Sequence, residues 1–206
     1  FDGIFCTFLP GMQGANALAD CLVGAVNPSG KLPLSWPKRI EDMPTYLSFP
    51  GDGMQVQYGE GIFLGYRGYD ARKIDPLYPF GHGLSYTEFA IEAVEAECER
   101  FAESVVVNVT VANIGYRAGK TVVQLYISDP ESTLTKPVQE LKAFRKVYLE
   151  PQESKMLSFT LNRHAFESYD PNLHAWTMEE GYYEILAGFS SRDIQGNCTV
   201  YADVES

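Results

Sequence analysis

The chain has 206 residues, 45% hydrophobic and 21% charged, so it has enough apolar mass for a packed core and is not a mostly disordered polypeptide. Its 16 basic and 27 acidic residues give a net charge of −11 without any Lys/Arg cluster, which argues against nucleic acid and anionic lipid as partners. No apolar run approaches the roughly 20 residues that span a bilayer, so we expect no membrane partner. The length fits one large domain or two small ones.

Residues 1–50 have the pattern of the end of an α/β unit. Ile4–Leu9 is an unbroken apolar run before Pro10-Gly11, which predicts a strand buried on both faces of a parallel sheet. A helix is predicted next, because Ala15, Leu18, Ala19 and Leu22 recur at helical spacing and Gly24 is placed to end it. One strand and one helix cannot form such a domain alone. We therefore expect the remainder upstream of Phe1 or in a partner chain.

Residues 25–85 contain no sustained periodicity, because seven prolines interrupt them. A flexible linker would be rich in Ser, Gly and charge, whereas this stretch is rich in aromatic residues. Such side chains need a surface to bury against, so we interpret the stretch as ordered chain lying on neighbouring domains. Its second part, residues 51–85, is predicted to be an ordered interdomain strap. The aromatic residues are Trp36, Tyr46, Phe49, Tyr58, Phe63, Tyr66, Tyr69, Tyr78 and Phe80.

From residue 86 onward the apolar pattern changes to a period of two, which predicts a mainly β fold. About seven strands separated by turn signals are expected, as in an immunoglobulin-like β-sandwich over residues 86–206. The predicted strands lie at 89–94, 105–111, 121–127, 141–149, 157–161, 183–189 and 198–204. Most of the acidic excess falls on this part, and we interpret it as a solvated face rather than a calcium site, because no Asp-rich loop has ligand spacing.

The residues alone give no complete catalytic constellation. His82, in Phe-Gly-His-Gly, is the most suggestive histidine, but a turn histidine is more often structural than catalytic. Asp52 and Glu60 each place one carboxylate in a Gly-containing loop without an identifiable partner. Gly11–Gly14 lacks the spacing of a phosphate-binding loop. The four cysteines are widely spaced and read as small hydrophobes, so we assign no catalytic, cofactor-binding or metal residue and no cofactor.

Four motifs in chain order resemble the C-terminal end of glycoside hydrolase family 3. Gln13 and Ala15 stand where members often carry Glu and Gly. The fourth motif resembles that family's fibronectin type III-like domain. The motifs are Leu9–Asp20 with Asn27–Pro33, Tyr58–Arg67, Tyr78–Thr87, and Gly119–Ile127 with Lys136–Lys142.

The resemblance implies the C-terminal part of a retaining exo-β-glucosidase acting on terminal non-reducing β-D-glucosyl residues. Residues 1–50 would then be the remnant of the α/β sandwich domain. The family's two catalytic carboxyl groups, which retention requires at about 5–5.5 Å, have no matching positions between Phe1 and Ser206. The expected partners are therefore the parent's barrel and α/β sandwich domains, with a β-glucoside or cello-oligosaccharide bound through those absent domains. The chain alone is expected to be inactive.

Three points complete these expectations. The run Gly65–Asp70 looks more like the β-glucosidase branch than the β-xylosidase one, although a β-xylosidase or N-acetylglucosaminidase of the same family stays open. Arg67 is expected to anchor the strap to a carboxylate or to backbone carbonyls. A non-catalytic interaction or carbohydrate-binding module is the alternative from another class. Compartment stays unknown, secreted or cytoplasmic, although Asn108 and Asn197 begin glycosylation sequons.

Overall fold

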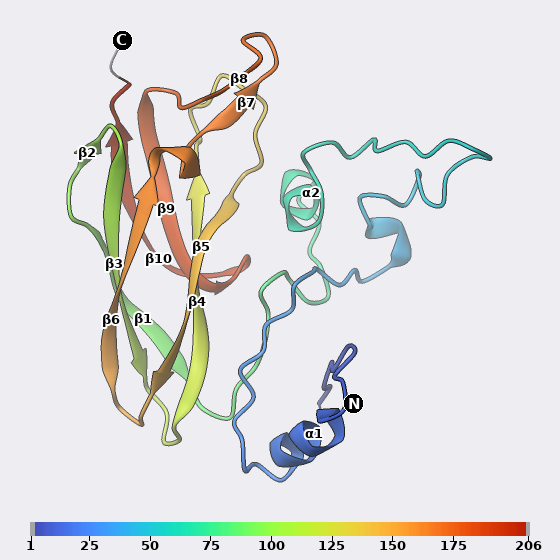
Figure 1. Cartoon of the computed structure of the whole chain (residues 1–206), viewed down its shortest axis with the longest axis vertical. Coiled ribbons are helices and arrows are strands. Elements are labelled where there is room, and N and C mark those ends of the chain that lie inside the picture. The colour runs from blue at the N-terminus through green and yellow to red at the C-terminus, as the bar shows by residue number, and fades with distance from the viewer. Residues whose placement is uncertain (1–2, 205–206) are drawn as a thin grey trace.

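A computed structural model describes residues 3–204 and has a β-sandwich as its main body (Figure 1). One sheet has three strands in the order β1-β3-β6, and the other has five in the order β2-β10-β9-β4-β5. All neighbouring strands are antiparallel except the short pair β2 and β10. The strands are β1 (Phe89–Ala96), β2 (Arg100–Phe101), β3 (Ser104–Asn113), β4 (Gly119–Ser128), β5 (Glu140–Leu149), β6 (Ser154–Asn162), β9 (Gly181–Ser190) and β10 (Asp193–Ala202).

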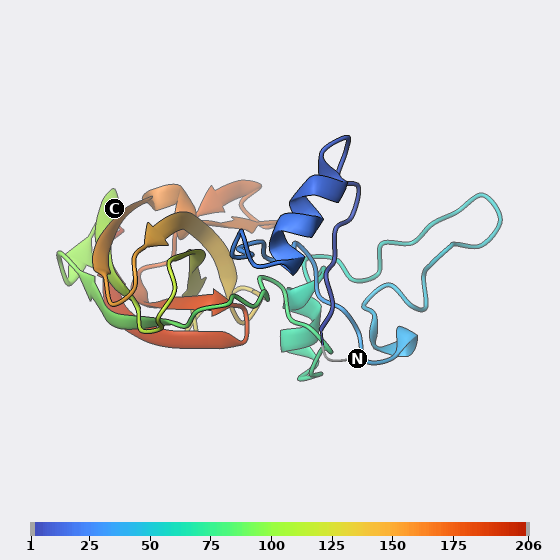
Figure 2. The ribbon, with the colours of Figure 1, turned by 90° about the horizontal axis from the view of Figure 1, so that it is seen from below.

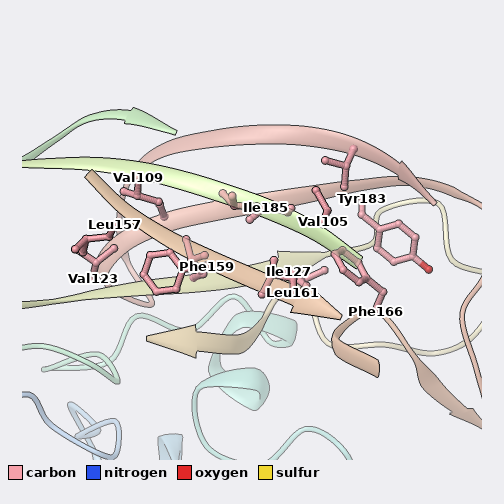
Figure 3. Close-up of a cluster of buried hydrophobic side chains, with 14 of the residues drawn as sticks. Val105, Val109, Val123, Ile127, Leu157, Phe159, Leu161, Phe166, Tyr183 and Ile185 are labelled. Atoms are coloured by element: carbon pink, nitrogen blue, oxygen red, sulfur yellow. The ribbon is translucent and has the colours of Figure 1, made fainter. Parts of the chain in front are cut away.

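The core lies between the two sheets and is built by the alternation along their strands. Val107 of β3 pairs with Phe159 of β6, and Leu125 of β4 pairs with Ala187 of β9; all four side chains are buried. Figure 3 shows side chains from both sheets meeting in this layer, with Phe166 and Tyr183 together at one end. The Phe166 ring packs edge-on against Tyr183 at a centroid distance of 5.3 Å. The predicted β-sandwich class is confirmed.

All seven predicted strands are present, with ends that differ by a few residues. Three short strands carry no period-two signal: β2, and the hairpin formed by β7 (Ser168–Asp170) and β8 (Ala175–Thr177). Two or three residues are too few for an alternation to be recognised. The glutamates near the first turn, which we expect to be solvated, are exposed; they are Glu92, Glu95, Glu97, Glu99 and Glu103.

Residues before the sandwich form three short helices joined by irregular chain. These are α1 (Gly14–Leu22), the 3-10 helix η1 (Ile40–Asp42) and α2 (Tyr66–Ala71). The prediction of α1 is confirmed, and Gly24 ends it with a φ of +74° after the cap residue Val23. The views in Figures 1 and 2 agree that α2 lies beside the sandwich, whereas the long loop between η1 and α2 projects away from it.

The prediction of a strand over Ile4–Leu9 is wrong. These residues are in irregular conformation, and within residues 3–204 no strand pairs with them. The Leu9 side chain is 98% exposed, and Ile4, Phe5 and Phe8 are exposed as well. A strand buried on both faces requires neighbours on each side, and the described chain supplies none.

Candidate functional site

The strap is fixed to the outer face of the five-stranded sheet by an aromatic cluster. Tyr66, the first residue of α2, stacks on Phe80 at 4.8 Å and meets Tyr126 of β4 edge-on at 6.0 Å between ring centroids. The Tyr66 hydroxyl accepts a hydrogen bond of 2.8 Å from the backbone N–H of Leu141. Burial raises the pKa of both tyrosines, so they stay neutral donors and acceptors. A six-residue helix is marginal by itself, so we attribute the stability of α2 to this packing.

Gln124 of β4 connects the strap to the sandwich through its buried amide. Its Nε2 donates to the carbonyl of Gly81 at 3.2 Å and to that of Phe189 at 2.7 Å. Its Oε1 accepts from the hydroxyl of Tyr126 at 2.6 Å. The strand pattern assigns Gln124 and Tyr126 to the solvent side of β4. Both are buried because the strap covers that face. The one sequence signal for this burial is Tyr126, a large aromatic residue at a position that the alternation assigns to solvent.

Charged groups surround the aromatic cluster and tie α2 to the loops of the sandwich. Arg67 forms a 3.0 Å ion pair with Glu140 at the start of β5, so the expectation that it anchors the strap to a carboxylate is confirmed. Asp70 accepts from Arg192 at 2.9 Å and from the side-chain amide of Gln139 at 3.2 Å. Burial raises the pKa of Asp70, and the bonds from Gln139 and Arg192 oppose that rise.

His82, the histidine singled out in the sequence, packs as a structural residue. The ring of His82 stacks on Tyr78 at 5.3 Å, and its backbone carbonyl accepts from the N–H of Leu32 at 2.8 Å. Burial lowers the pKa of His82, and the Lys31 ammonium lowers it further. Asp193 opposes both effects, but no described residue makes a hydrogen bond to the ring nitrogens, so no carboxylate orients the ring as a catalytic base requires.

Asp129 and Glu179 are two carboxylates that share one cation, Lys136. Glu179 also accepts hydrogen bonds from the hydroxyls of Ser132 and Thr133. Burial opposes its charge, but these donors and Lys136 together lower the pKa of Glu179 to about 2. The adjoining cavity, lined in part by Asp129 and Lys136, has room for about one water molecule. The pair therefore locks the loop after β4 and does not form a hydrolytic site.

A larger groove of about 460 Å³ is lined by residues 28–31, 83–85 and 87–89 together with residues of the sandwich. Its charged groups include Lys31, whose Nζ donates to the carbonyl of Gly83 at 2.9 Å and lies 5.8 Å from the ring centroid of Phe189. Burial lowers the pKa of Lys31, and Asp193 counteracts that effect. Among residues 3–204, no cluster of three or more His, Cys, Asp or Glu side chains could hold a metal ion. No helix in that range is long and apolar enough to cross a membrane.

Many large apolar side chains between residues 9 and 64, outside the sandwich, are exposed, and we call this set the outer surface. Met12, in the turn before α1, is 99% exposed, Leu47 is 96% exposed and Met54 is fully exposed. Apolar side chains that gather in a large contiguous patch mark an interaction surface. The outer surface comprises Leu9, Met12, Leu22, Val23, Leu47, Phe49, Met54, Val56, Tyr58, Ile62 and Leu64.

Asp52 and Glu60, the two loop carboxylates singled out in the sequence, both lie in the projecting loop. The backbone of Asp52 bridges to Gln55 in a tight turn. Glu60 lies between two glycines nearer to α2, and its Oε2 atom makes no hydrogen bond with a described residue. The structure therefore assembles no acid–base pair around either residue.

Two family models match the sequence, one before the sandwich and one within it. The glycosyl hydrolase family 3 C-terminal domain matches residues 1–86, and the fibronectin type III-like domain matches residues 121–191. The fold and these matches define the C-terminal region of a glycoside hydrolase. The chain belongs to glycoside hydrolase family 3.

Relatives with assigned names are several times longer than this chain. Thermostable beta-glucosidase B of Acetivibrio thermocellus is 46% identical over 189 residues, which are 91% of this chain and 25% of the relative. Probable beta-glucosidase K of Emericella nidulans is 47% identical over 186 residues, 89% of this chain and 22% of the relative. The chain thus spans about a quarter of the length of these relatives.

Solved structures give the same relation. The crystal structure of the family 3 beta-glucosidase of Bifidobacterium adolescentis superposes with a TM-score of 0.88 at 40% identity, covering 92% of this chain and 28% of that one. The structure of beta-glucosidase 3B from Thermotoga neapolitana in complex with glucose gives 0.85 at 38% identity, covering 92% and 26%.

Proposed function

We propose that this chain is the C-terminal structural portion of a retaining exo-acting β-glucosidase that hydrolyses terminal non-reducing β-D-glucosyl residues. Its relatives carry the name beta-glucosidase, and the chain corresponds to about a quarter of their length. The two catalytic carboxyl groups belong to the part of these longer relatives that this chain does not match. The function of the chain is to hold that part in place, and it has no hydrolytic activity alone.

The observation that carries this proposal is the contrast between the two sides of the chain. The side facing the sandwich is sealed by Tyr66, Phe80, Gln124 and Tyr126. The outer surface leaves side chains such as Leu9 and Met54 almost fully in water. Burial of such a surface stabilises by about 25 cal/mol per Å² of apolar area, so a covering partner would bind it favourably. The barrel and α/β sandwich domains of a β-glucosidase are that partner.

The test is an assay of the purified 206-residue chain with an aryl β-glucoside, such as p-nitrophenyl β-D-glucoside. We expect no release of nitrophenol above the uncatalysed rate, because the two carboxyl groups that double displacement requires in the family have no matching positions in this chain. A turnover that follows the protein through purification would overturn the proposal. An aryl β-xyloside and an aryl N-acetylglucosaminide belong in the same assay, because the sequence leaves both substrates open.

The second candidate is a carbohydrate-binding module, and one feature favours it. Trp176 and Tyr169, on the β7–β8 hairpin, are 59% and 48% exposed. Their rings lie 5.9 Å apart at an interplanar angle of 70°, so they do not form the flat row that suits an extended β-glucan. Titration with glucose and cello-oligosaccharides, followed by tryptophan fluorescence, tests this function. Saturable quenching that is lost in Trp176→Ala would support it over the structural role.

A further inference from the structure

The groove of about 460 Å³ reaches the end of the sandwich core. Its lining includes Phe189, a residue of the core, and Phe89, which packs against the core. A volume between about 300 and 1,000 Å³ is typical of small-molecule sites, which combine apolar walls with a few polar groups that orient the ligand. The groove therefore has the size of a ligand site, unlike the cavity beside Lys136.

A buried hydroxyl without a partner opens onto this groove. Thr121 is 4% exposed, because it lies in the inward-facing row of β4 that continues as Val123 and Leu125. Its Oγ1 makes no hydrogen bond with a residue in 3–204. Within that range, the one enclosed side-chain oxygen or nitrogen that lacks a partner is Oε2 of Glu60, so the Thr121 hydroxyl still touches solvent, and it does so where Thr121 lines the groove. Buried polar groups are normally paired, so this exception calls for a partner.

Lys31 and Asp193 provide a donor and an acceptor beside that hydroxyl. The Lys31 Nζ donates to the carbonyl of Gly83 at 2.9 Å, which uses one of its three N–H groups. Asp193 is near enough to raise the pKa of Lys31, yet the two side chains form no ion pair in the described part of the chain. Oδ1 of Asp193 accepts from Gln195 at 3.2 Å, and Oδ2 makes no bond with a residue in 3–204. Both side chains line the groove and have bonding capacity left for a ligand.

The charges of the groove favour a neutral ligand. Two cations, Lys31 and Lys120, face two anions, Glu88 and Asp193, so the lining has no net charge. An anion such as phosphate would meet two carboxylates as well as two ammonium groups and would gain little. A molecule with several hydroxyl groups can donate to a carboxylate and accept from an ammonium at the same time. Apolar side chains such as Leu84 suit the C–H face of a sugar ring.

We propose that this groove binds a neutral sugar of mono- or disaccharide size through the Thr121 hydroxyl, the Asp193 carboxylate and the Lys31 ammonium. The site goes beyond the proposed function, because no residue of the outer surface lines it. It also shares no residue with the β7–β8 hairpin, on which the alternative of a carbohydrate-binding module depends.

The test follows the backbone amide resonances of the whole chain by NMR during separate titrations with D-glucose, cellobiose and inorganic phosphate. At least one of the two sugars should shift the amides of residues lining the groove, with saturation below about 100 mM, which includes weak millimolar sites. Phosphate should leave those amides unshifted. The inference would be overturned by an absence of saturable shifts with both sugars, by sugar shifts confined to the β7–β8 hairpin, or by a response to phosphate as strong as that to the sugars.

Two variants identify the side chains that bind. Thr121→Val removes the hydroxyl and keeps the shape, so we expect the dissociation constant of the sugar to rise about two- to tenfold, as for one lost hydrogen bond. Thr160→Val makes the same change at an exposed site of β6 outside the groove and should leave the constant within about 1.5-fold of its value in the unmodified chain. Unmodified affinity in a folded Thr121→Val, or an equal loss in Thr160→Val, would contradict the proposal.

Asp193→Asn gives an independent reading if Thr121→Val does not fold. It replaces a charged acceptor by a neutral one on an exposed residue, so the dissociation constant should rise at least about threefold with little change in melting temperature. Unmodified affinity in Asp193→Asn would also overturn the inference.

Discussion

At the scale of single residues, the contact between strap and sandwich depends on side chains that a strand pattern assigns to solvent. Gln124 and Tyr126 alternate with the core residues Val123, Leu125 and Ile127 of β4, yet all five are buried. A buried amide with three good hydrogen bonds fixes geometry more strictly than an apolar side chain of similar size, because leaving any of its groups unpaired is costly. The specificity of this contact therefore resides in Gln124, and its apolar area in Tyr66 and Phe80.

Gly81→Ala should disrupt that contact. Gly81 has a φ of +81°, and a Cβ there would collide with Oε1 of Gln124. The substitution combines backbone strain with displacement of a buried, hydrogen-bonded amide, so we expect a loss of about 2–4 kcal/mol in the free energy of unfolding. Urea denaturation measures it. Gly59→Ala is the matched control, because a Cβ at Gly59 would meet no other atom within 4 Å. Equal midpoints for the two variants would contradict the account.

Glu179 should make stability depend on pH in acid. Its pKa is lowered from 4.5 to about 2 in the folded state. A group with a lowered folded pKa stabilises above its unfolded pKa and loses that contribution as pH falls through the folded one. We therefore expect the difference in melting temperature between the unmodified chain and Glu179→Gln to be full above about pH 4.5 and to shrink toward about pH 2. Glu131→Gln, at an exposed site, should show no such trend. A constant difference for Glu179→Gln would contradict the assignment.

At the scale of elements, the sequence predicts the strands that local periodicity determines. It misses features that depend on chain far away in the sequence. The seven long strands alternate and pack, so the sandwich could be predicted together with most of its core. The Ile4–Leu9 strand could not be judged, because its apolar run indicates a tendency to be buried and not the presence of neighbours. Likewise Arg67 could be assigned an anchoring role from its type, but its partner Glu140 is 73 residues away and had no local signal.

The sandwich core should be the stable element of the chain. Phe159 of β6 is 4% exposed, so Phe159→Ala should cost about 3–5 kcal/mol of unfolding free energy through lost burial and the cavity that remains. Phe144 of β5 is 68% exposed, and Phe144→Ala should change the free energy of unfolding by less than about 0.5 kcal/mol. Chemical denaturation compares the two variants. A similar loss in both would mean that the core does not lie between the sheets.

The projecting loop should be the most readily opened element. Its residues 46–64 include most of the exposed side chains of the outer surface, and few of its amides are hydrogen-bonded compared with those of β4. Amide hydrogen exchange should therefore be fast over 46–64 and slow over β3, β4 and β9. Addition of the Acetivibrio thermocellus relative without its matching quarter should slow amide exchange in the loop and leave exchange in the strands unchanged. Loop amides as protected as those of β4 in the chain alone would contradict this view.

At the scale of the whole molecule, the chain has a self-sufficient half and a dependent half. The sandwich closes its own core, whereas residues 3–64 expose apolar side chains. Relatives that are about four times as long provide a reason for that asymmetry. We propose that the outer surface holds the catalytic part of a β-glucosidase in place.

Complementation tests that claim most directly. The fragment of the Acetivibrio thermocellus relative without its matching quarter is assayed with p-nitrophenyl β-D-glucoside, first alone and then with increasing amounts of this chain. We predict little or no hydrolysis by either piece alone and a saturable gain of at least about tenfold when both are present. Full activity of the relative's fragment alone, with no gain on addition of a chain that remains folded, would contradict the account.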